Sequence, residues 1–127
     1  MKNILIVGLG SIGRRHTDNF IKYFDEIDIV DINPDRLDQA KSEYNINNCF
    51  NNYSDALDNN SYDAVAITTP PHLHLPIAKL AAENGSNLFI EKPLGINVDG
   101  WAEIADLCKK THLVSYVAYC VRHIPYT

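Results

Sequence analysis

The hydrophobic positions of this chain alternate between continuous runs and runs with a helical period. Continuous apolar runs occupy residues 4–7, 64–67 and 88–90, which is typical of strands covered on both faces in a parallel sheet. Between them, apolar residues recur at the spacing of a helix face. Four such faces are predicted, formed by Ile12, Phe20, Ile21 and Phe24, by Leu37, Ala40 and Tyr44, by Leu73, Ile77, Leu80 and Ala81, and by Trp101, Ile104, Ala105 and Cys108.

Residues with special backbone preferences mark the ends of these predicted helices. Asn33 and Pro34 supply an N-cap and a first-turn proline for the second helix. Gly85 is a C-terminal stop for the helix over 73–84, and Asn97 is placed to cap the helix that carries Trp101.

Three further strands are expected over residues 27–31, near 48–50 and over 113–119, which gives six strands that alternate with helices. Right-handed crossovers then predict an α/β fold, a doubly wound parallel Rossmann sheet of order 3-2-1-4-5-6 with helices on both faces, in three αβα layers. The polar stretch 45–61 fits a loop and a short helix equally well.

Length and charge narrow the class of protein. A chain of 127 residues suits one domain, and its net charge of −5 argues against a general nucleic-acid surface. No apolar run approaches the roughly 20 residues that cross a bilayer. The three cysteines are widely separated and odd in number, which disfavours a disulfide framework and a zinc site. We therefore expect a cytoplasmic protein with no metal and no membrane or nucleic-acid partner.

A G-x-G-x-x-G turn follows the first predicted strand directly, at Gly8, Gly10 and Gly13. In a dinucleotide site the first glycine permits the tight exit from the strand, the second leaves space for the pyrophosphate, and the third lets the helix approach the sheet. The amides near Ser11 and Ile12 would then face the phosphates at a helix N-terminus.

Asp31 closes the second predicted strand, 18 residues after Gly13. A carboxylate there accepts hydrogen bonds from the adenosine ribose and repels a 2′-phosphate, so NAD is favoured over NADP. Arg14, Arg15 and Arg36 keep NADP open, because a nearby guanidinium pairs well with phosphate.

Two further motifs stand after the fourth and fifth predicted strands: Thr-Thr-Pro-Pro-His-Leu-His at 68–74 and Glu-Lys-Pro at 91–93. Together with residues 8–16, they resemble the Gfo/Idh/MocA oxidoreductases over essentially the whole chain. The resemblance implies an enzyme that transfers a hydride between NAD(P) and a hydroxyl or carbonyl of a sugar, sugar derivative or cyclitol.

The resemblance also implies roles for individual residues. It makes Lys92 the catalytic lysine, which takes the proton of the substrate hydroxyl while a hydride leaves the carbon that bears this hydroxyl. Thr69 and Pro70 would pass beneath the cofactor, and His74 would orient the loop or the nicotinamide ribose. Glu91 would position the cofactor ribose or pair with Lys92.

His16 matches another position of the family, but it interrupts the apolar stripe of the first helix. Packing with a satisfied hydrogen bond is expected for it.

Residues 1–119 are expected to form the nucleotide-binding domain, and residues 120–127 resemble the start of a linker to a second, substrate-binding domain. We expect the chain to be a truncated part of a homo-oligomeric enzyme, able to bind cofactor without turnover. The alternatives are a non-catalytic nucleotide-sensing or scaffold module, and a biliverdin-reductase-like or oxidised-sugar-hydrolysing relative.

Overall fold

The computed structural model describes residues 2–91 and 100–118. Its strands are β1 (Asn3–Val7), β2 (Glu26–Val30), β3 (Asn48–Phe50), β4 (Ala64–Ile67), β5 (Asn87–Glu91) and β6 (Ser115–Ala118). Its helices are α1 (Ser11–Phe20), α2 (Pro34–Glu43), α3 (Tyr53–Asn59), α4 (His74–Glu83) and α5 (Trp101–Lys110), and a 3₁₀ turn, η1 (Pro71–Leu73), precedes α4. None of the helices in these ranges has the length and apolar character needed to cross a membrane.

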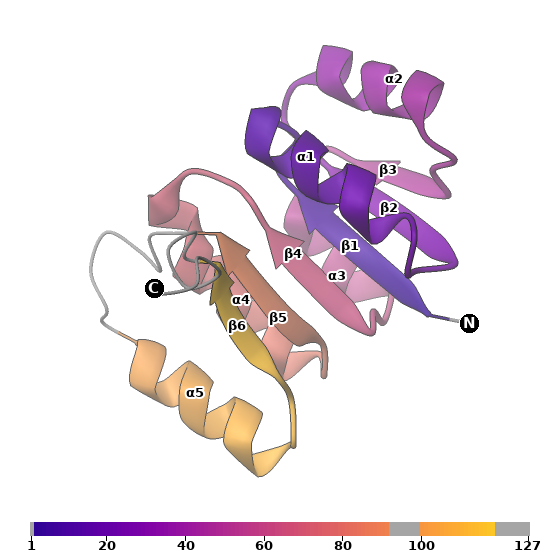
Figure 1. Ribbon diagram of the computed structural model, residues 1–127. Coiled ribbons are helices and arrows are strands. Elements are labelled where there is room, and N and C mark those ends of the chain that lie inside the picture. Colours follow the sequence, from indigo (N-terminus) through magenta and orange to yellow (C-terminus); the bar gives the residue numbers. More distant parts are fainter. Residues whose placement is uncertain (1, 92–99, 119–127) are drawn as a thin grey trace, which may run out of the picture.

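The described strands form one parallel sheet of order β3-β2-β1-β4-β5-β6, which confirms the predicted Rossmann topology. Helices α1 and α2 lie on one face of this sheet, and α3 and α4 lie on the opposite face (Figure 1). The sheet is therefore the middle of three layers.

The register of the sheet brings four strand ends to one edge. Val7 of β1 lies opposite both Val30 of β2 and Ile67 of β4, and Ile67 lies opposite Ile90 of β5. The residues that follow these strands consequently meet at the carboxyl edge, where ligands of open α/β sheets bind.

Both faces of the sheet are packed. On β1, Leu5 and Val7 belong to the core that includes residues of α3, α4 and α5, whereas Ile4 and Ile6 belong to the core that includes Ala40 of α2. All four β1 side chains are at most 2 % exposed. This alternation confirms that the continuous apolar run marks a strand covered on both sides, and burial of each large aliphatic side chain contributes about 1.5–3 kcal/mol.

Two of the predicted helix signals are confirmed. The Asn33 side chain accepts a hydrogen bond of 2.9 Å from the amide of Asp35, with Pro34 as the first residue of α2. Gly85 takes a φ of 83° after α4, a conformation that favours glycine. Gly100 occupies the N-cap position of α5, where Asn97 was expected, and Asn97 lies outside the described residues.

The predicted apolar face of α1 is wrong at Ile12 and Ile21, which are 39 % and 42 % exposed. The buried residues of α1 are Gly13 and Thr17, and the start of this helix lies so close to the turn after β1 that only glycine fits at position 13. The helix also ends at Phe20, so Ile21 lies just beyond it.

Other element boundaries shift by a few residues. β2 ends at Val30, so Asp31 is the first residue after the strand, and α4 begins at His74 because η1 takes the preceding residues. The ambiguous polar stretch contains β3 and then α3, and β6 begins at Ser115.

Candidate functional site

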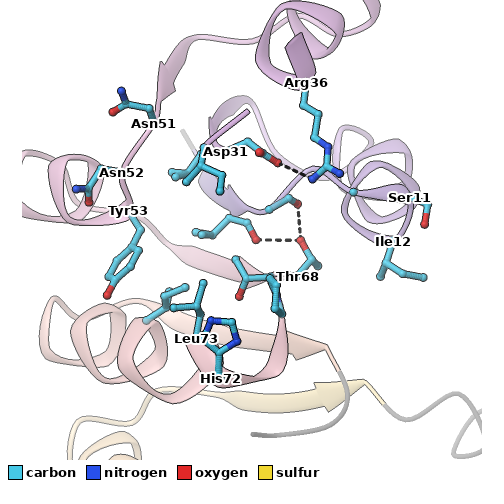
Figure 2. Close-up of a pocket in the computed structure, with 18 residues that line it drawn as sticks. Ser11, Ile12, Asp31, Arg36, Asn51, Asn52, Tyr53, Thr68, His72 and Leu73 are labelled. Carbon is cyan, nitrogen blue, oxygen red and sulfur yellow. Dashed lines mark hydrogen bonds and ion pairs between the residues drawn. The ribbon is translucent and has the colours of Figure 1, made fainter. Parts of the chain in front are cut away.

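A cavity of about 720 Å³ opens at the carboxyl edge of the sheet, between the turn after β1 and the segments after β2, β3 and β4 (Figure 2). Ser11 and Ile12 lie on one side of it, and Asn51, Asn52 and Tyr53 lie on the other. Its size is in the range of sites for small molecules and cofactors. The lining residues are Val7, Gly8, Gly10, Ser11, Ile12, Val30, Asp31, Ile32, Arg36, Asn51, Asn52, Tyr53, Thr68, Thr69, Pro70, His72, Leu73 and Ile77.

Two glycines shape the turn that forms the floor of this cavity. Gly8 has a φ of 98°, and a Cβ there would lie 2.8 Å from the carbonyl oxygen of Thr68. A Cβ on Gly13 would lie 1.9 Å from the carbonyl oxygen of Gly8. The structure thus confirms a tight exit from β1 and a close approach of α1 to the sheet, both of which require glycine.

Gly10 differs from these two glycines because the space around it is open. A Cβ built on Gly10 meets no heavy atom within 4 Å, and its φ of −65° suits any residue. Gly10 is also the N-cap of α1 and provides no side-chain cap, whereas Asn33 and Asn52 cap α2 and α3. The first amides of α1 are therefore available to an anion in the cavity.

The Asp31 carboxyl group is fixed by main-chain donors. Its Oδ2 accepts a hydrogen bond of 2.7 Å from the amide of Leu9, and its Oδ1 accepts one of 2.9 Å from the amide of Asn33. Each carboxylate oxygen has a second lone-pair site. The side chain of Asp31 is 4 % exposed, and the guanidinium of Arg36 lies 3.6 Å from Oδ2 (Figure 2).

The two threonines after β4 are bonded differently. The Thr68 hydroxyl donates to the carbonyl oxygens of Gly8 and Val7, at 2.6 and 3.0 Å. The Thr69 hydroxyl oxygen is buried and has no hydrogen-bond partner among the described residues. The buried His74 ring holds this loop, since its Nε2 bonds the carbonyl oxygen of Thr69 at 2.7 Å.

Glu91, the last residue of β5, pairs with His16 of α1. Glu91 Oε2 and His16 Nε2 lie 2.6 Å apart, and the His16 ring packs edge-on against Phe89 at 4.9 Å between ring centroids. The expectation of a packed His16 with a satisfied hydrogen bond is confirmed. Lys92 lies outside the described residues.

Most of the predicted cofactor-binding residues line the cavity: Gly8, Gly10, Ser11, Ile12, Asp31, Thr69 and Pro70. Gly13, His74 and Glu91 do not line the cavity. Gly13 and His74 support segments that line it, and Glu91 directly precedes Lys92 in the sequence. Their direct contact with a cofactor stays a prediction. Among the described residues, the His, Cys, Asp and Glu side chains form no group of three that would hold a metal ion.

Sequence reasoning missed the side of the cavity that β3 supplies. Asn51, Asn52 and Tyr53 follow this strand of three residues and line the cavity. Ile32, which follows β2, also lines the cavity and was missed, although its apolar side chain is 89 % exposed. The signal was present, because residues after any strand of a parallel sheet reach the same edge.

The sequence model of an oxidoreductase family with an NAD-binding Rossmann fold, Gfo/Idh/MocA, matches residues 2–119. The chain is 28 % identical over 123 residues to scyllo-inositol 2-dehydrogenase (NAD(+)) of Bacillus subtilis strain 168, which covers 94 % of this chain and 36 % of that protein. It is 30 % identical over 128 residues to 4-carboxy-2-hydroxymuconate-6-semialdehyde dehydrogenase of Sphingobium sp. strain SYK-6, with 96 % of this chain and 39 % of that protein covered.

The fold has solved counterparts. A crystal structure of scyllo-inositol dehydrogenase from Lactobacillus casei, with NAD(H) and scyllo-inositol bound, superposes with a TM-score of 0.86 at 26 % identity. That match covers 98 % of this chain and 38 % of the other, so the chain spans a little over a third of the relatives it matches. The glycine turn, the strand order and the family match all agree. The chain belongs to the Gfo/Idh/MocA oxidoreductases and folds as their NAD-binding Rossmann domain.

Proposed function

We propose that this chain binds NAD in the cavity at the carboxyl edge of its sheet and acts as the nucleotide-binding domain of a longer dehydrogenase. The proposal depends on one observation above all: the open glycine turn and the fixed Asp31 carboxyl group line the same cavity. A diphosphate and a ribose diol are the two parts of a dinucleotide that these features suit.

The residues present fit this cofactor in three ways. The uncapped N-terminus of α1 and the open space at Gly10 suit a phosphate group. Asp31 keeps acceptor capacity for ribose hydroxyls after its two main-chain bonds. The buried Thr69 hydroxyl lacks a partner in the described part of the chain, and a bound cofactor would supply one.

For the chemistry, we propose oxidation of a secondary alcohol of a sugar, sugar derivative or cyclitol. A bound NAD would supply the acceptor for the hydride of the carbinol carbon. Oxidation to a carbonyl also requires loss of the hydroxyl proton, and Lys92, as a neutral amine, is the group that we propose accepts it. In the reverse direction its ammonium form donates the proton and polarises the carbonyl.

Two relatives support this substrate class, because their names state an inositol as substrate. We propose that residues 1–119 form the cofactor domain and that residues 120–127 begin the connection to a substrate domain. The cytoplasmic location and the homo-oligomer stay predictions.

A pair of glycine substitutions tests cofactor binding. Gly10→Ala places a methyl group in open space inside the cavity and leaves an allowed φ, so we expect unchanged thermal stability. Its NADH affinity, measured by calorimetric titration, should fall by about tenfold or more, since overpacking by a methyl group is typically worth ~1–3 kcal/mol.

Gly85→Ala is the matched control. This residue has a φ of 83° and lies outside the cavity, so its substitution should lower the melting temperature and leave NADH affinity unchanged. Wild-type chain that binds no NADH would contradict the proposed function. Equal affinity in Gly10→Ala and wild type would contradict the placement of the cofactor.

A further inference from the structure

A histidine to which the sequence assigned no role lies in the wall of the cavity. His72, in the 3₁₀ turn η1, lines the cavity next to Leu73 and is exposed. It makes no hydrogen bond or ion pair with the described parts of the chain. Figure 2 shows its ring on the opposite side of the cavity from Arg36. The ring nitrogens of His72 are therefore available to a ligand.

The segment that carries His72 is held against the glycine turn. The Thr68 hydroxyl donates a hydrogen bond of 2.6 Å to the carbonyl oxygen of Gly8, and a Cβ on Gly8 would lie 2.8 Å from the carbonyl oxygen of Thr68. The amide of Leu73 donates a hydrogen bond of 3.0 Å to the carbonyl oxygen of Pro70, which closes η1. His72 thus belongs to a bonded turn that starts at the proposed diphosphate site.

The charges around His72 are nearly balanced without it. Asp31 and Arg36, which also line the cavity, lie 3.6 Å apart and offset each other, and Tyr53 is neutral near pH 7. Helix α4 packs against η1, and its titratable residues do not line the described cavity: His74, Lys79 and Glu83. Within the described wall, histidine is the residue type that ordinarily changes charge between pH 5 and 8.

On these grounds we propose that His72 is a further cofactor-binding residue, which as an imidazolium binds the diphosphate of NAD. The inference rests on the proposed function, since it concerns the same cavity. An anion favours the protonated imidazole, so a proton is taken up with the cofactor near neutral pH. The affinity for NAD is therefore higher at low pH and falls as the imidazole loses its proton.

Calorimetric titration of NAD⁺ at pH 6.0 and pH 8.5 into wild type, His72→Asn and His112→Asn tests it. Wild-type affinity should fall by about fivefold across this range, below the full value of a hydrogen bond between charged groups because His72 is exposed. His72→Asn should remove this dependence. His112→Asn is the matched control, because His112 is exposed outside the cavity and its φ of 58° suits asparagine.

Two further measurements separate charge from other effects of the imidazole ring. His72→Lys keeps a positive charge over the whole range, so this variant should bind NAD⁺ equally well at pH 6.0 and pH 8.5. Adenosine lacks the diphosphate, so its affinity for wild type should not change with pH.

The outcomes distinguish this inference from the proposed function. If the affinity of wild type for NAD⁺ does not change with pH, or if His72→Asn keeps the change, the role of His72 is refuted and NAD binding stands. The same holds if adenosine shows an equal change, if His72→Lys loses affinity at pH 8.5, or if His112→Asn abolishes the dependence. If wild type binds no NAD⁺ at either pH, the proposed function fails as well.

Discussion

At the scale of single residues, Thr68 and Thr69 show how adjacent positions of one type serve different purposes. The Thr68 hydroxyl ties the end of β4 to the glycine turn through two carbonyl oxygens. The Thr69 hydroxyl is buried beside the cavity with no partner in the described residues. A group of the first kind stabilises the fold, and a group of the second kind is suited to a ligand.

Valine substitutions at these two positions should therefore have opposite effects. Thr69→Val removes a hydroxyl that bonds nothing in the protein, so stability to urea should hold or rise, while NADH affinity falls about fivefold, the value of one hydrogen bond of ~1 kcal/mol. Thr68→Val should instead lower the free energy of unfolding by about 1–2 kcal/mol. Unfolding curves and calorimetry on both variants measure the two effects, and a Thr69→Val chain with full NADH affinity would refute the assigned contact.

The sequence predicted residues whose role depends on the local backbone. Gly8 and Gly13 could be assigned because a strand-to-helix turn demands glycine at those places. The pairing of Glu91 with His16 was not predictable, since it joins residues 75 positions apart. Only the packing of α1 against the sheet brings them together.

At the scale of elements, apolar runs identified the central strands, because these are covered on both faces. On α1 the helical period is confirmed at Phe20, which packs against the core, and is wrong at Ile12. The fully buried residues of α1 are Gly13 and Thr17, because a Cβ on Gly13 would lie 1.9 Å from the carbonyl oxygen of Gly8, whereas the rings of His16 and Phe20 pack against Phe89 farther along the helix. Hydrophobic periodicity therefore identifies the packed residues of α1 only away from the close approach at Gly13.

One contact between elements has a consequence for pH. The Tyr62 hydroxyl, just before β4, donates a hydrogen bond of 2.6 Å to Asp28 of β2, and both residues are buried. Burial, then the hydrogen bond and charge of Asp28, raise the pKa of Tyr62 above its usual value of 10.0. Because the folded state keeps this phenol protonated, its contribution to stability is complete below pH 10 and is lost as the pH rises above that value.

Tyr62→Phe should make the loss of stability above pH 10 smaller. At pH 7 the same variant should be about 1–3 kcal/mol less stable, because Asp28 loses a donor. Burial and the Asp18 carboxylate raise the pKa of Tyr44 to about 12, so part of the alkaline loss should remain. Urea unfolding from pH 7 to 11 measures both effects, with the 73 % exposed Tyr23→Phe as control. An unchanged alkaline slope in Tyr62→Phe would exclude this explanation.

At the scale of the whole molecule, the sheet register assembles the cavity from segments after four strands. The segments after β1 and β4 were predictable because those strands are continuous apolar runs, and the segment after β2 was predictable from Asp31, which follows Gly13 by 18 residues. The fourth follows β3, which has three residues, none of them fully buried, so its pairing leaves a weak mark on the sequence. The order of the sheet was still predictable, since handedness and chain order restrict the alternatives.

We propose that the diphosphate of a dinucleotide binds to the main chain of the turn after β1. The most direct test is a titration of ¹⁵N-labelled chain with NADH, followed by two-dimensional ¹H–¹⁵N NMR. We predict that the largest shifts occur at the amides of residues 8–13 and at Asp31 and Thr69, while the amides around Gly85 stay unchanged. Saturating NADH that leaves residues 8–13 unperturbed, or that shifts only residues remote from the cavity, would contradict the claim.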